Sequence, residues 1–165
     1  MPAHDRMWRD GIVAGLLGAA GVAVWFLDVD LIAGRPFFTP ALLGRAVLGV
    51  LGRDIAIHGT VFFVLWYTVL HVVALMVACC IGSSLLMASR SVPQVAVGVA
   101  GFFVEFEVGF YFLAIFLSEH DILGALAWYQ IGAANLVASG HVGGYLLRRH
   151  PEFGGNLTHA LDGTT

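Results

Sequence analysis

Four long apolar stretches limit what this chain can fold into more than any other feature of its sequence. They occupy roughly residues 11–32, 58–88, 92–118 and 122–147 of the 165-residue chain. A helix needs about 20 mostly apolar residues to cross the hydrocarbon core of a bilayer. Each stretch reaches that length, so the sequence predicts four transmembrane α-helices.

The composition supports a protein that is surrounded by lipid. Hydrophobic residues make up 59% of the chain and charged residues only 12%. A water-soluble domain carries roughly 25% charged residues, which is enough to cover its surface. The net charge is −3 and no basic cluster occurs, so nucleic acid is excluded as a partner. We therefore expect the lipid bilayer to be the main surrounding of the protein.

Short connections between the later stretches indicate how the helices are arranged. The links near residues 89–91 and 119–121 are only a few residues long, which forces consecutive helices to lie antiparallel. The predicted fold is all-α, a membrane-embedded up-down four-helix bundle. Residues 1–150 form one transmembrane domain, and residues 151–165 form a flexible polar tail.

The first loop contains a further helical signal. Thr39 is a natural N-cap, and Pro40 suits the first position of a helix. An apolar run follows, with Arg45 and Arg53 among its residues. This pattern predicts a short interfacial helix in the first loop, which lies on the outer surface of the membrane.

Arginine placement predicts the orientation of the chain. Cytoplasmic loops of membrane proteins carry an excess of Lys and Arg. Five arginines fall at the two termini and in the second loop, namely Arg6, Arg9, Arg90, Arg148 and Arg149. Three fall in the first loop, namely Arg35, Arg45 and Arg53. We expect both termini to lie in the cytoplasm.

Small residues indicate where helices approach one another. Gly11 and Gly15 form a G-x-x-x-G pair in the first helix, a pattern that lets two backbones come close in a membrane. Two interpretations remain open. The glycines pack against another helix of the same chain, or they offer a surface to a partner helix.

Polar residues near the middle of the apolar stretches form the most informative group. With a rise of 1.5 Å per residue, His71, Glu105 and Asn135 reach similar depths, and Glu107 lies slightly further out. Ionisable groups inside a membrane are costly, and they usually serve a function. One interpretation is a structural set of hydrogen bonds between helices. The other is a functional site for a proton, a metal ion or a small ligand.

Histidine and carboxylate side chains raise the question of a metal ion. His71, Glu105, Glu107 and His141 are the candidate ligands, because imidazole and carboxylate suit zinc, iron or manganese. The sequence has no E-x-x-H pair, so the di-iron pattern of four-helix bundles is not met. Haem between His71 and His141 is not favoured, because the two histidines fall at different depths.

A second polar cluster is predicted at the outer rim of the bundle. Its members are acidic residues and histidines near the outer ends of the helices: Asp28, Asp30, His58, Glu119, His120 and Asp121. They could hold a divalent cation. They could equally be ordinary capping and loop residues, because loops collect polar side chains.

Several segments carry a resemblance to a known group of proteins. Together they resemble small four-helix bacterial membrane proteins of unassigned activity, and the segments are Gly11–Gly15, Gly34–Pro40, Phe106–Phe110, Ala134–Leu136 and Tyr145–Pro151. The resemblance implies a protein of the bacterial inner membrane. It implies no activity, ligand or cofactor.

No nucleophile motif, phosphate-binding loop or dinucleotide fingerprint occurs in the sequence, so no catalytic residue is assigned. We expect a small non-catalytic membrane subunit that packs against itself or in a larger membrane complex. Two alternatives remain open. One is a metal- or cofactor-binding protein that uses His71 and the two glutamates, and the other is a pathway for protons or a small solute.

Overall fold

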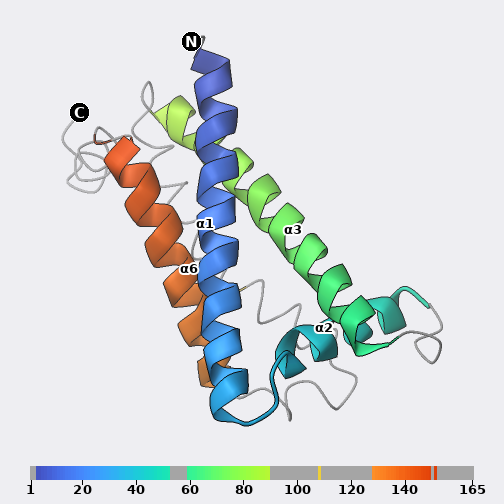
Figure 1. Cartoon of the computed structure of the whole chain (residues 1–165). Coiled ribbons are helices and arrows are strands. Elements are labelled where there is room, and N and C mark those ends of the chain that lie inside the picture. The colour runs from blue at the N-terminus through green and yellow to red at the C-terminus, as the bar shows by residue number, and fades with distance from the viewer. Residues whose placement is uncertain (1–2, 53–58, 90–107, 109–127, 150, 152–165) are drawn as a thin grey trace.

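The computed structural model describes residues 3–52, 59–89, 108, 128–149 and 151, and every regular element in these ranges is helical. The elements are α1 (Ala3–Ile32), α2 (Phe38–Val50), α3 (Thr60–Ser89) and α6 (Trp128–Arg149). Figure 1 shows α1 and α6 side by side, with α3 crossing α1 at an angle. The predicted all-α class is confirmed for the part of the chain that the structure describes.

The helix boundaries differ from those that hydropathy predicts. Helix α1 begins at Ala3 rather than near residue 11, because the polar residues before Gly11 continue the same helix. Helix α3 agrees closely with the predicted stretch 58–88. The predicted helix 92–118 lies outside the described residues apart from Val108, as does the predicted tail apart from Pro151. The described part of the last helix begins at Trp128.

Helix α1 ends in a glycine-dependent cap. Gly34 adopts a φ of 70°, which only glycine enters at low cost, and its N–H donates to the carbonyl of Leu31 at 3.0 Å. The N–H of Arg35 reaches back to the carbonyl of Asp30 at 2.9 Å. Together these bonds make a Schellman motif, which satisfies carbonyls at the helix end and turns the chain toward α2.

The start of α2 corrects one prediction. The N-cap is Phe37, which has a φ of 64° and gives the helix no side-chain hydrogen bond, so the prediction that Thr39 is the N-cap is wrong. Thr39 instead lies in the first turn of α2, and Pro40 follows it there. The capping oxygen comes from α1, because the backbone N–H of Thr39 donates to Asp30 Oδ2 at 2.7 Å.

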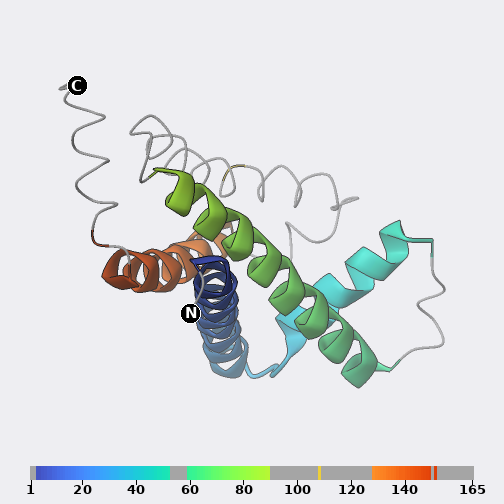
Figure 2. The ribbon, with the colours of Figure 1, turned by 90° about the horizontal axis from the view of Figure 1, so that it is seen from above.

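Helix α1 is the central element of the described structure. It packs against both α3 and α6, and both of these helices run in the opposite direction to α1 (Figure 1). Figure 2, which looks down on the molecule of Figure 1, shows α2 extending away from α1 and lying across the beginning of α3. The register of α1 against its two neighbours therefore sets the height of every residue on α3 and α6.

Glycines bring α1 into close contact with α3. A Cβ added at Gly11 would lie 2.7 Å from Cα of Cys80, and one added at Gly15 would lie 2.5 Å from Cα of Met76. Cβ atoms do not approach a backbone that closely, so only glycine allows this spacing. The interpretation that the G-x-x-x-G pair packs within the chain is confirmed.

Two further glycines face α6. A Cβ at Gly18 would lie 2.9 Å from Cγ2 of Val142, and one at Gly21 would lie 3.2 Å from Cγ1 of Val137. Closer to the C-terminal end of α1, an apolar cluster joins α1 to α6. Its members are Val22, Phe26, Ile131 and Ala134. The indole N–H of Trp25 donates to the carbonyl of Gln130 at 3.1 Å in the same region. Helix α1 is thus fixed against α6 along its second half.

Helix α2 is held on α3 by its apolar side. Ala41, Leu48 and Phe63 form a buried cluster, and Gly44 lies against the backbone carbonyl of Phe63. The guanidinium of Arg45 lies 5.1 Å from the ring centroid of Phe63. The short helix predicted in the first loop is confirmed as a helix, and it lies next to the start of α3.

The contact between Gly15 and Met76 makes a prediction about stability. Gly15→Ala must push α1 and α3 apart, and we expect it to lower the free energy of unfolding by roughly 1–3 kcal/mol, as overpacking does. Equilibrium unfolding in a mild detergent measures the change. Gly140→Ala is the matched control, because no residue in the described ranges lies within 4 Å of a Cβ at that position. Equal effects of the two substitutions would contradict the close contact.

Candidate functional site

Three buried side-chain nitrogen atoms have no hydrogen-bond partner among the described residues, and two of them belong to residues predicted for the mid-membrane layer. Nε2 of His71 and Nδ2 of Asn135 are both buried, and no described residue offers either atom an acceptor or donor. The imidazole of His71 stacks on the ring of Tyr67, with centroids 5.5 Å apart and planes inclined by 19°. Stacking fixes the ring but leaves its nitrogens available.

The helix register places His71 and Asn135 at similar heights. On α3, Cys80 lies opposite Gly11 and Met76 opposite Gly15, so the two helices advance in matched steps. Continuing by five residues puts His71 opposite about position 20 of α1, since both helices rise 1.5 Å per residue. On α6, Asn135 follows Ala134, which belongs to one buried cluster with Val22 and Phe26 of α1. Both polar residues therefore lie opposite the second half of α1, within about six residues of each other along it.

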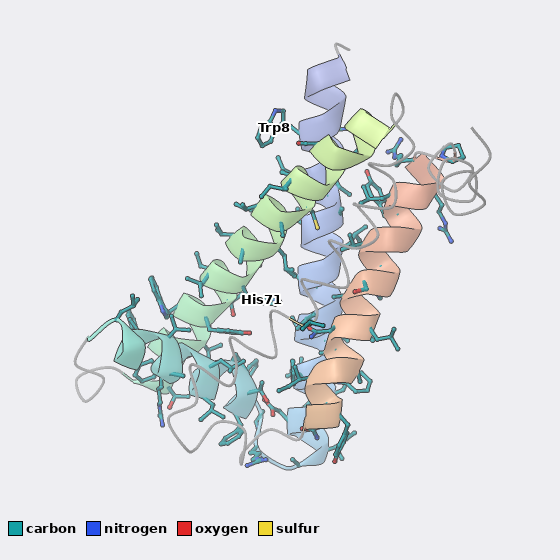
Figure 3. All side chains as sticks on the ribbon, turned by 180° about the vertical axis from the view of Figure 1, so that it is seen from behind. Trp8 and His71 are labelled. Atoms are coloured by element: carbon teal, nitrogen blue, oxygen red, sulfur yellow. The ribbon has the colours of Figure 1, made fainter. Side chains whose placement is uncertain are left out.

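The two side chains also share one side of α1. Gly18 is the point where three helices meet, because a Cβ there would lie 2.9 Å from Val142 of α6 and 3.7 Å from Leu75 of α3. Asn135 precedes Val142 by two helical turns, and His71 precedes Leu75 by about one turn. His71 and Asn135 thus lie on the faces of α3 and α6 that carry Leu75 and Val142, the two side chains nearest Gly18. Figure 3 labels His71 partway along α3, well away from Trp8 near the beginning of α1.

The remaining members of the predicted layer are not all placed. Glu105 and Glu107 lie outside the described residues. His141 is described, and its Nδ1 lies 2.8 Å from the carbonyl of Val137, against Gly21. Its position on α6 is about 120° from that of Asn135, by the 100° rotation per residue. Within the described ranges, no three His, Cys, Asp or Glu residues gather as metal ligands, so the proposed metal set is not supported.

The predicted outer-rim cluster separates into different roles. Asp30 is buried, and its carboxylate accepts hydrogen bonds from the N–H of Thr39 at 2.7 Å and from the hydroxyl of Thr39 at 2.8 Å. Asp28 is exposed on the same helix. His58, Glu119, His120 and Asp121 lie outside the described residues. Asp30 is therefore a structural residue that holds the beginning of α2 to the end of α1.

Sequence reasoning missed one buried acid. Asp10 is 1% exposed, and the hydroxyl of Tyr145 donates to its Oδ1 at 3.3 Å. Nε of Arg9 lies 3.9 Å from the same oxygen. The Asp10–Tyr145 bond links α1 to α6 at the end opposite to Asp30. Asp10 could have been found by continuing the first helix backward, since it directly precedes the Gly11–Gly15 pair.

Comparison with known proteins gives no identification, because no protein-family model, curated protein or solved structure matches the chain. The resemblance to small bacterial membrane proteins stays a prediction. The function is therefore argued from the residues themselves.

The buried carboxylate of Asp30 makes the second prediction. Asp30→Ala removes the acceptor of both Thr39 hydrogen bonds and leaves a buried N–H unpaired, so we expect a loss of about 1–3 kcal/mol in the free energy of unfolding. Hydrogen exchange should also become faster at the beginning of α2. The exposed Asp28 supplies the control, and Asp28→Ala should change neither quantity. Unchanged exchange in α2 of the Asp30 variant would contradict the assigned role.

Proposed function

We propose that the chain is an integral protein of the bacterial inner membrane and that it serves as a subunit, packing against its own copies or in a larger membrane complex. In this proposal α1 and α3 cross the bilayer, and α2 lies along its outer surface. Both termini face the cytoplasm. The observation that carries the proposal is the uncovered apolar surface of α3.

The length and apolarity of two helices support membrane insertion. Two segments are long and apolar enough to cross a membrane, namely Trp8–Ile32 of α1 and Thr60–Ser84 of α3, and each has 25 residues. Large apolar side chains are exposed along the whole of α3, at Val61, Leu65, Val69, Val73, Val77 and Ile81. In water, an uncovered apolar face of this size would promote aggregation.

Burial distinguishes α3 from the core helix of a water-soluble protein. A core helix is apolar because other parts of the protein cover it on every side. Only 11% of the most apolar stretch of α3 is buried inside the chain. Lipid, or the helices of another subunit, is the surrounding that such a surface fits.

The described part of α6 has a different surface. It carries Gln130, Asn135, Ser139 and His141, and it is not among the helices that are apolar enough to cross a membrane by themselves. No described residue lies within 4 Å of a Cβ built at Gly140, Gly143 or Gly144, and the nearby Leu136 is 75% exposed. A helix with an open glycine face and polar groups is typical of one that packs against other helices in a membrane.

Charge at the helix ends supports the proposed orientation. Arg9 of α1 and Arg148 and Arg149 of α6 lie toward the same end of the bundle. Arg35 and Arg45 lie toward the other end, where their guanidinium groups stand over the rings of Phe38 and Phe63. The excess of positive charge beside both termini favours a cytoplasmic location for that end.

The size of the assembly in native-membrane nanodiscs tests the proposed function. We expect native mass spectrometry to show more than one protein chain per particle. Gly140→Ile and Gly144→Ile should reduce the assembly to single chains, because bulky side chains block close helix packing. Ala23→Ile, at an exposed site on α1, is the control and should leave the assembly intact. A wild-type protein that is always a single chain would refute the subunit role.

A further inference from the structure

The unpaired nitrogens of His71 and Asn135 carry an unfavourable energy that the folded chain must offset. A buried polar group without a partner loses its hydrogen bonds to water and gains none in return. Both Nε2 of His71 and Nδ2 of Asn135 are in this state with respect to the described residues. Such atoms are uncommon in native proteins, and each one requires an explanation, for which an absent ligand is one candidate.

Other unpaired polar atoms do not share this location. Nε1 of Trp66 is also buried without a partner, but Trp66 packs on the apolar cluster between α2 and α3. Oγ of Ser83 lies toward the opposite end of α3. His71 and Asn135 are distinguished by lying at similar heights, on the helix faces that carry Leu75 and Val142 beside Gly18.

The chemistry of the two nitrogen atoms limits which functional groups a ligand can present to them. An asparagine Nδ2 only donates hydrogen bonds, and a neutral imidazole donates from Nε2 in one of its tautomers. A molecule that presents acceptor oxygens therefore satisfies both atoms when His71 carries its proton on Nε2. The flat ring of Tyr67 beside His71 adds an apolar surface on which a planar group can rest.

The depth of His71 in the proposed bilayer limits the charge that a ligand can carry. His71 is separated by 11 residues from Thr60 and by 13 from Ser84, the ends of the apolar stretch of α3. These separations correspond to roughly 16 and 20 Å along the helix axis. A hydrocarbon core about 30 Å thick places His71 near its middle. Charged groups are strongly disfavoured there, so the acceptor oxygen belongs to a neutral molecule that dissolves in the membrane interior.

We propose that the space between His71 and Asn135 binds a neutral carbonyl group of a lipid-soluble molecule, with a membrane quinone head group as the favoured source. Asn135 donates from Nδ2 to one carbonyl oxygen, and His71 donates from Nε2. A quinone fits better than a phospholipid, because the ester carbonyls of phospholipids lie at the edges of the hydrocarbon core and not at its centre. The proposal rests on the proposed insertion of α3 in the membrane, but it concerns binding alone and does not require the protein to be a subunit of a complex.

Binding to purified protein in nanodiscs tests this proposal. The full chain is titrated with a short-tailed ubiquinone analogue and, separately, with a diacylglycerol, and the quenching of tryptophan fluorescence is recorded. We expect saturable binding of the quinone, and His71→Leu and Asn135→Leu should each weaken it about tenfold, the worth of one hydrogen bond. His141→Leu is the matched control, because its imidazole is already bonded to the carbonyl of Val137, and it should bind normally.

Thermal denaturation of the same variants separates a ligand site from a structural set of hydrogen bonds. Without ligand, His71→Leu and Asn135→Leu should denature at the same temperature as the wild type or higher, because each removes an unpaired buried group. The quinone should raise the denaturation temperature of the wild type only. Saturable binding of the diacylglycerol that His71→Leu and Asn135→Leu both weaken would support a carbonyl site filled by a lipid ester. No saturable binding of either probe, or binding that both variants retain, would overturn the proposal.

Discussion

The close approach of α1 to its two neighbours is the constraint on which the rest of the structure depends. Gly11 and Gly15 bring the backbone of α1 against Cys80 and Met76 of α3, and Gly18 brings it against Val142 of α6. In the proposed membrane surrounding, apolar side chains would gain little by leaving lipid for another helix, so tight packing would supply the attraction. Glycine spacing along one helix therefore determines how the other two are placed along it.

That register distributes the polar residues over three heights. Asp30 lies at one end and caps α2 through Thr39, while Asp10 lies at the other end and accepts a hydrogen bond from Tyr145. Both acids have partners, and both join one helix to another element. His71 and Asn135 lie between these two ends with buried nitrogens that are unpaired among the described residues. This contrast between the paired acids and the unpaired nitrogens supports the proposed ligand contact at His71 and Asn135.

The sequence was sufficient for features that depend on local pattern. Apolar length predicted α1 and α3, and the Gly11–Gly15 spacing predicted a close backbone contact, although it could not name Cys80 and Met76 as the neighbours. Features that depend on distant partners were missed or wrong. Thr39 resembles an N-cap, yet its hydrogen bonds go to a carboxylate on the preceding helix.

The candidate site could be predicted only in part, for a physical reason. Depth follows from counting residues along a helix, so the sequence alone could predict similar heights for His71 and Asn135. The side on which each residue lies depends on the rotation of its helix, and this was fixed only by the contacts of Gly18 with Leu75 and Val142. Asp10 was missed because hydropathy marks the apolar part of α1 and not its helical beginning.

The account rests on lipid being the surrounding of the uncovered face of α3. A nitroxide scan at Val61, Val69, Val73 and Val77, with Cys79 and Cys80 replaced by alanine, measures this in liposomes. Collisions with oxygen should rise toward Val69 and Val73 while collisions with a water-soluble nickel complex fall to a minimum there, since oxygen concentrates in the hydrocarbon core and the nickel complex is excluded from it. A nickel complex that reaches Val73 as readily as Val61 would place this face in water and contradict the account.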